Sequence, residues 1–188
     1  MNRTILLAAT FALSILANSV HAATFGHVSL YGDATSTECA LTDDQPRTAD
    51  VFVVHHIGEY VADAYLLAFR VAASAGFTGS WLQDIVPTGM FAVGTSPDGI
   101  TIGYQACRTG DVPVLRISYQ LFGTSSPCSS LQVAAYPDIG FIETSNCSFE
   151  IFMVEGGSIV VNADDSCPCQ MPVPVKQTTW GAVKAIYR

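Results

Sequence analysis

The stretch CSSLQVAAYPDIGFIETSNCSFEIFMVEGGSIVVNADDSCPC (128–169) decides the fold, because short strand-like segments alternate in it with turn residues and cysteines. Pro137-Asp138 and Gly156-Gly157 supply the turns. Folding the segments back on these turns as a meander predicts a three-stranded sheet. The same folding predicts that the four cysteines of the stretch gather at one end of that sheet.

The apolar–polar alternation of half-buried strands extends over most of the chain. VPVLRISYQLF (112–122) is the clearest case, and in 63–74 the alternation places Tyr65, Leu67, Phe69 and Val71 on one face. Roughly nine or ten strands with turn signals between them predict an all-β fold, a two-sheet antiparallel sandwich. The other expected strands are 25–32, 50–57 and 100–106, with short edge segments at 81–86 and 90–94.

The first 22 residues have the pattern of a secretory signal peptide. Arg3 precedes an uncharged apolar run at 5–17, and Val20-His21-Ala22 offers small residues for cleavage. The run is shorter than the roughly 20 residues that span a bilayer. We therefore expect a signal peptide (1–22), one sandwich domain (23–170) and a linker with a short tail (171–188), with no membrane span after the signal is removed.

The composition is acidic and argues against nucleic acid as a partner. Removal of Arg3 leaves 7 basic residues against 16 acidic ones, a net charge of −9. Such a chain is repelled by phosphate backbones and by anionic membranes. It suits a protein that is secreted, periplasmic or displayed at the cell surface.

All six cysteines lie after the signal peptide, and an even count in an exported chain predicts disulfides. Cys39 and Cys107 stand apart from the other four, which predicts the pair Cys39–Cys107. Within the 128–169 stretch, Cys147–Cys167 and Cys128–Cys169 avoid the strained ring that Cys167–Cys169 would close. The set Cys128–Cys147 with Cys167–Cys169 stays open as the alternative.

The last thirteen residues change character. A threonine at 178 or 179 can cap a helix, and residues 23–175 carry 4 basic and 16 acidic groups whereas 176–188 carry three basic groups and no acid. A helix this short is marginal alone and is expected to dock, on its own acidic sandwich or on a partner. The predicted docking stripe consists of Trp180, Val183, Ile186 and Tyr187.

Few residues offer chemistry. His55 and His56 are neighbours on a strand and point to opposite faces, and His27 is placed to meet one of them across a strand pair. The cysteines lack the paired knuckles of a structural zinc site. Calcium is the possible cofactor, since loops carry oxygen ligands, although a solvated acidic turn explains them as well. These weak candidates are Asp43, Asp44, Asn162, Asp164 and Asp165.

No nucleophile motif or carboxylate pair can be recognised, so we expect a protein that is not an enzyme. Several aromatic side chains are candidates for a carbohydrate-binding face, although aromatics in a sandwich usually belong to the core. They are Tyr60, Tyr65, Trp81 and Tyr104.

Three resemblances accompany these patterns. FGHVSLYGDATSTECAL (25–41) resembles the first strand of chaperone–usher pilins, although the next cysteine follows 68 positions after Cys39 and the predicted helical tail replaces a final strand. The strand order resembles immunoglobulin-like or cohesin-like sandwiches. The whole mature chain, with its ending TTWGAVKAIYR (178–188), is similar to uncharacterised secreted proteins of environmental bacteria. This last resemblance implies a shared exported domain and no activity.

These observations favour a secreted or cell-surface, non-catalytic binding or adhesion-type module for an extracellular protein or glycan. The alternatives are a structural subunit assembled by pilin-like strand donation and a hydrolase without a recognisable motif. A donated-strand subunit requires a gap in one sheet, and a hydrolase requires a cleft where ionisable side chains converge.

Overall fold

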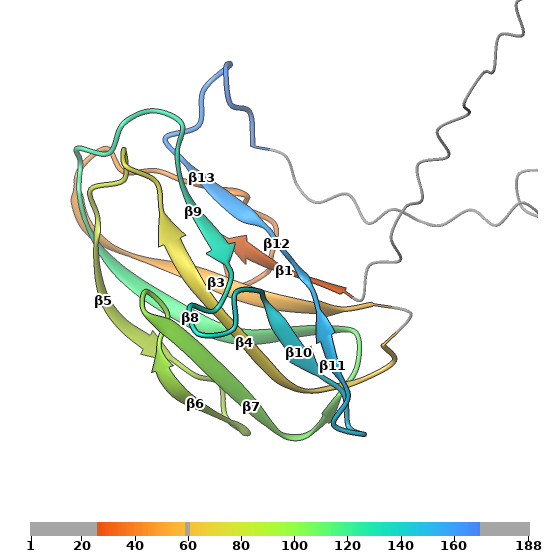
Figure 1. Cartoon of the computed structure of the whole chain (residues 1–188). Helices are drawn as coiled ribbons and strands as arrows, with labels where there is room; N and C mark the ends of the chain where they lie inside the picture. Colours follow the sequence, from red (N-terminus) through yellow and green to blue (C-terminus); the bar gives the residue numbers. More distant parts are fainter. Residues whose placement is uncertain (1–25, 59–60, 170–188) are drawn as a thin grey trace, which may run out of the picture.

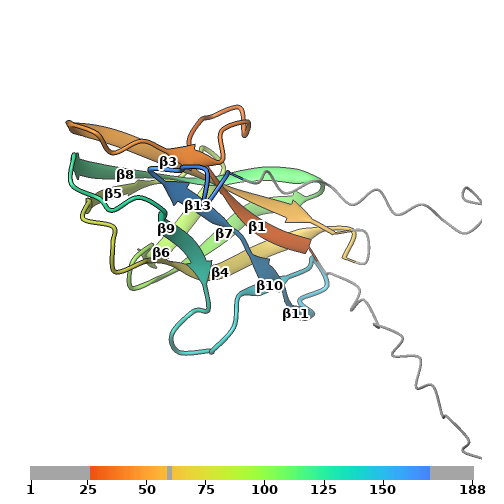
Figure 2. The same ribbon diagram turned by 90° about the horizontal axis from the view of Figure 1, so that it is seen from above.

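The computed structural model describes residues 26–58 and 61–169, which form two packed β-sheets (Figure 1). Sheet 1 has the order β12 (Glu155–Gly156), β1 (Gly26–Tyr31), β3 (Pro46–Ile57), β8 (Asp111–Phe122) and β5 (Ser80–Ile85). Sheet 2 has the order β11 (Ile151–Met153), β10 (Glu143–Ser145), β4 (Ala64–Ala73), β9 (Ser129–Ala134), β13 (Ser158–Val161) and β2 (Ala40–Leu41). Beside β4, sheet 2 continues through β7 (Gly99–Arg108) to β6 (Met90–Thr95). Figure 2 separates the layer with β3 and β8 from the layer with β4 and β10.

The predicted all-β sandwich is therefore confirmed. Most strand pairs are antiparallel, and two short pairs, β1–β12 and β13–β2, are parallel. Between residues 26 and 169, leaving out 59–60, no residue is helical, and hence no helix there could cross a membrane. The predicted signal peptide, the C-terminal helix with its docking stripe, and Tyr60 lie outside the described residues.

The core lies between the sheets and follows the alternation of the sequence. On β4 the side chains of Leu67, Phe69 and Val71 are buried, as predicted, and they face the buried Val51 of β3 and Ile117 of β8 across the sandwich. Burial of a side chain of this size stabilises the fold by roughly 1.5–3 kcal/mol. The apolar faces of the two sheets therefore hold them together.

The predicted meander is wrong at both of its turns. Gly156-Gly157 does not fold β13 back onto β11, because β13 pairs with β9 and β2 whereas β11 pairs with β10. Strand β9 does not fold back onto β10; both strands pair with β4, β9 over Arg70–Ala73 and β10 over Leu66–Ala68. Hydrogen bonds within the loop 135–142 bring its two ends together. The backbone N–H of Tyr136 donates to the carbonyl of Phe141, and that of Gly140 donates to the carbonyl of Tyr136. The two strands therefore follow each other along β4, and Figure 1 shows β10 and β11 at one end of the sheet and β9 and β13 towards the other.

This connection also changes the disulfides. All three predicted pairs are wrong, as is the alternative set. The chain runs straight on from β9 to β10, so Cys147 is carried away from Cys128 to the far end of the sheet, where it meets Cys107 at the end of β7. The observed pairs are Cys39–Cys169, Cys107–Cys147 and Cys128–Cys167.

Candidate binding face

The outer face of sheet 2 carries exposed apolar side chains on β6 and on β11, the first and the last of five neighbouring strands. Strand registers place Phe91 of β6, Leu66 of β4 and Ile151 of β11 in one row that also contains Gly103 and Ser145. The next row contains Val93, Thr101, Ala68, Glu143 and Met153. We call these ten residues the candidate face.

The apolar side chains at the two margins of the candidate face are exposed. The exposed fractions are 53% for Phe91, 67% for Val93, 61% for Ile151 and 63% for Met153. They point away from the core because their strand neighbours, such as Met90 and Ala92 on β6, pack against it. Phe91 and Val93 form one exposed apolar pair on β6, and Ile151 and Met153 form another on β11. Clustered exposed apolar side chains mark a candidate interaction site.

A glycine in the middle of the face accommodates the aromatic ring at its margin. A Cβ atom added at Gly103 would lie only 2.1 Å from Cζ of Phe91, so the ring lies over the glycine backbone. The ring of Phe91 thus contacts the neighbouring strand β7, while about half of its side chain stays exposed to solvent.

The face also contains one carboxylate in an apolar setting. Glu143 of β10 lies between Ala68 and Met153 in the cross-strand row and is half-buried. Among residues 26–58 and 61–169 its side chain has no hydrogen-bond or ion-pair partner. A cationic group on a bound partner would compensate this charge.

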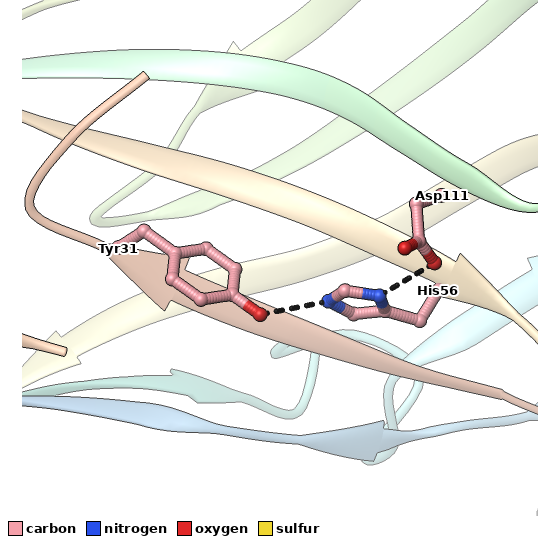
Figure 3. Close-up of polar contacts among 3 residues, drawn as sticks. All are labelled: Tyr31, His56 and Asp111. Carbon is pink, nitrogen blue, oxygen red and sulfur yellow. Dashed lines mark hydrogen bonds and ion pairs between the residues drawn. The ribbon is translucent and has the colours of Figure 1, made fainter. Parts of the chain in front are cut away.

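The outer face of sheet 1 carries a different, polar arrangement (Figure 3). Tyr31 Oη lies 3.2 Å from His56 Nε2, and His56 Nδ1 lies 2.7 Å from Asp111 Oδ1. The ring of His27 stacks on that of His56 with centroids 4.2 Å apart. The prediction that His27 contacts one of the two neighbouring histidines across a strand pair is thus confirmed, and the contacted residue is His56.

This row does not form an accessible catalytic group. Tyr31 is only 5% exposed, so a substrate has little access to its phenol oxygen. Burial, and then the neighbouring His56, lower the pKa of His27. The row instead ties β1, β3 and β8 together, and no sequence pattern pointed to Asp111 because its role depends on the β3–β8 register.

His55 points to the opposite face, as predicted, and is fully buried in the core. Its Nδ1 lies 2.9 Å from the hydroxyl of Tyr104, while its Nε2 has no hydrogen-bond partner within the described part of the chain. Burial lowers the pKa of His55 to about 3 and raises that of Tyr104. The pair is therefore neutral at physiological pH.

The aromatic candidates for a carbohydrate face do not gather. Tyr104 is in the core, Trp81 is 37% exposed on β5 of sheet 1, and Tyr65 of β4 packs edge-on against Phe149. Of the described aromatic candidates, Tyr104 is a core residue, as expected of aromatics in a sandwich, whereas Tyr65 and Trp81 are partly exposed.

The calcium candidates are engaged in structural hydrogen bonds. The carboxylate of Asp43 accepts from the backbone N–H groups of Gly123 and Ser125, and these bonds outweigh burial and lower the pKa of Asp43. The amide of Asn162 donates to the carbonyls of Asp43 and Ser125.

The other acidic candidates are exposed, and Asp164 accepts a bond from the backbone N–H of Ser166. Asp164 also lies beside Cys128 and Cys167, whose sulfurs are joined in a disulfide and are not free thiolates. A calcium site stays a prediction from the sequence.

The comparisons with known proteins match the fold alone. No family model and no curated protein matches the chain. A cohesin module of a family 33 glycoside hydrolase from Clostridium perfringens ATCC13124 matches with a TM-score of 0.56 and 9% identity, covering 75% of this chain and 99% of the module. This chain has a cohesin-like fold.

A second structure supports the same assignment. The sixth cohesin of scaffoldin B from Acetivibrio cellulolyticus, solved in complex with a Cel5 dockerin mutant, matches with a TM-score of 0.50 and 11% identity. The match covers 75% of this chain and 100% of that cohesin. The likeness to cohesin-like sandwiches suggested by the sequence is thus confirmed for the fold.

Proposed function

We propose that this chain is a secreted or cell-surface binding module that is not an enzyme, and that its candidate face takes up a protein partner. The observation that carries the proposal is the set of exposed apolar side chains at the two margins of the face, Phe91, Val93, Ile151 and Met153. Between the margins lies the carboxylate of Glu143, which has no partner among the described residues. Three disulfides within the sandwich support an oxidising location outside the cytoplasm.

A protein partner is favoured over a glycan by the chemistry of the face. Sugar rings are usually bound by stacking on aromatic side chains, and the face offers only one, Phe91. Aliphatic side chains beside a single anion suit an amphipathic helix or strand that carries a Lys or Arg. The Acetivibrio cohesin, which has the same fold, was solved with a protein bound to it.

Neither alternative has comparable support. A groove of about 330 Å³ opens on the outer face of sheet 1, but Arg116 is its one ionisable lining residue, so acid–base groups do not converge there. A subunit completed by strand donation needs a gap in its sheet. Within residues 26–58 and 61–169, β1 is paired on both edges, by β3 and β12, and its Val28 is fully buried.

Site-specific photo-crosslinking tests the proposal. A photoreactive amino acid is placed at Val93 or Met153 of the full chain in its producing cells, with Asp44, an exposed loop residue outside the candidate face, as control. We expect covalent adducts with one protein from both face positions and not from the control. Equal adducts at all three positions, or none from the face, would refute the assignment.

A further inference from the structure

We infer that the C-terminal segment 176–188 lies on the candidate face of its own chain and that a partner must displace it. This inference rests on the proposed function and names the occupant of the same face. It follows from the chemistry of the two surfaces, from where the described chain ends, and from the length of chain that remains.

The chemistry of the segment complements that of the face. Trp180, Val183 and Tyr187 fall on one side of a helix, and Lys184 lies four residues after Trp180, at the border of the same stripe. The face offers aliphatic side chains around Glu143, whose carboxylate has no partner within the described residues. A docked segment would therefore cover the apolar side chains of the candidate face and bring a lysine to Glu143, the single carboxylate among its ten residues.

The overall charges point the same way. Residues 23–175 contain 4 basic and 16 acidic groups, whereas the segment contains Lys176, Lys184 and Arg188 and no acid. Opposite charges favour the encounter of the segment with the body. Tethering favours docking on the same chain over docking on another, because the local concentration of a tethered segment is high.

The disulfide Cys39–Cys169 fixes the point from which the segment starts. Cys39 immediately precedes β2, and the registers of β2, β13, β9 and β4 place it level with Ala73 on β4. Leu67, which lies on β4 between the face residues Leu66 and Ala68 and points into the core, is six residues further along this strand. The separation is about 20 Å along the strands and about 14 Å across three strand spacings, or roughly 25 Å in all.

The remaining chain has the right length to bridge this distance. Residues 170–175 reach at most about 20 Å when extended, and Pro172 and Pro174 favour that form. A helix that begins at 176 advances about 6 Å to Trp180 and about 16 Å to Tyr187. Trp180 would then lie at the level of Leu67 and thus of the two rows of the candidate face.

Trp180 itself is the reporter for the experiment. The chain has two tryptophans, so Trp81→Phe makes Trp180 the single emitting tryptophan. Trp81 is partly exposed, and its Nε1 donates to the carboxylate of Asp84. In this full-length background we expect Trp180 emission at a shorter wavelength than in the free peptide 176–188, with reduced quenching by iodide. Both properties should be independent of protein concentration.

Variants of the face identify where the segment lies. Val93→Asp with Met153→Asp should return emission and quenching to the values of the free peptide. Glu143→Lys should raise the undocked fraction about two- to fivefold, the size expected of one exposed ion pair, and adding Lys184→Glu should restore docking. Asp44→Lys, the matched control for charge, should change nothing.

Three results would overturn the inference: quenching equal to that of the free peptide in the parent chain, protection of Trp180 unaffected by the face variants, or protection that grows with protein concentration. The proposed function is judged separately by the crosslinks from Val93 in a Trp180→Asp chain, in which the segment is released. If Val93 in that chain forms adducts with a partner protein, the proposed binding function stands even if the segment does not dock.

Discussion

At the scale of single residues, His55 gives the sandwich a defined sensitivity to acid. Its pKa is about 3 in the folded protein and about 6.5 in an unfolded chain, so the unfolded chain takes up the proton first as the pH falls. The stability of the folded state is therefore complete above pH 6.5 and declines below it.

We expect the free energy of unfolding to fall by up to about 1.4 kcal/mol per pH unit between pH 6.5 and 5 because of His55. Urea unfolding at several pH values measures this slope. His55→Gln cannot titrate and should remove most of it, whereas His27→Gln, at a half-buried position, should remove less. An unchanged slope in His55→Gln would mean that His55 is not the group responsible.

Gly103 sets the position of the Phe91 ring. In Gly103→Ala the new Cβ would meet the far end of an exposed, movable ring, so the ring should swing away at a cost of less than about 1 kcal/mol. In Gly156→Ala the Cβ would lie 2.2 Å from the carbonyl oxygen of Val133, a backbone atom that cannot move aside. Thermal unfolding should therefore show a much larger loss for Gly156→Ala, and equal losses would contradict the packing described.

At the scale of elements, the sequence predicted where the long strands lie but not which strands pair with one another. Alternation located β4 and β8 because each buries one face. It could not show that β9 and β10 both pair with β4, because a Pro-Asp turn is equally compatible with a hairpin and with the closed loop 135–142. The wrong pairs within 128–169 followed from the meander, whereas Cys39–Cys107 was wrong because distance in the sequence does not show which cysteines the strands bring together.

The candidate face was also beyond sequence reasoning. Ile151, Phe152 and Met153 are all apolar, so the alternation that separates a core side from a solvent side is missing there. Only the pairing of β11 with β10 shows that Ile151 and Met153 face outward. The histidine row, in contrast, was partly predictable, because neighbouring residues on a strand must point to opposite faces.

The pairing Cys39–Cys169 can be tested by releasing one sulfur. In Cys39→Ala we expect the liberated thiol on Cys169, found by alkylation and peptide mapping without reduction. If the label is found on Cys107 instead, the pair is Cys39–Cys107, as expected from the sequence, and Cys39–Cys169 is wrong. Because the two cysteines are 130 positions apart, the variant should also lose about 5 kcal/mol in the chain-entropy estimate, against about 4 kcal/mol for loss of Cys107–Cys147.

At the scale of the whole molecule, the two sheets have different tasks. The outer face of sheet 1 bears the hydrogen-bonded row of Tyr31, His56 and Asp111, which joins three of its strands. The outer face of sheet 2 bears exposed apolar side chains on β6 and β11. The disulfides hold the sandwich in shape at the ends of its strands. The proposed binding function assigns the partner to the outer face of sheet 2.

The most direct test of whether the partner binds to sheet 2 is the affinity of face variants for the protein that crosslinking captures. Val93→Asp with Met153→Asp should weaken binding at least about tenfold, since each substitution places a carboxylate where the partner would contact an apolar side chain, and loss of such a contact costs roughly 1 kcal/mol or more. Phe122→Asp removes a similarly exposed apolar side chain from β8 of sheet 1 and should leave the Kd unchanged. If the Phe122 variant loses as much affinity as the double variant, or the double variant loses none, sheet 2 is not the binding face.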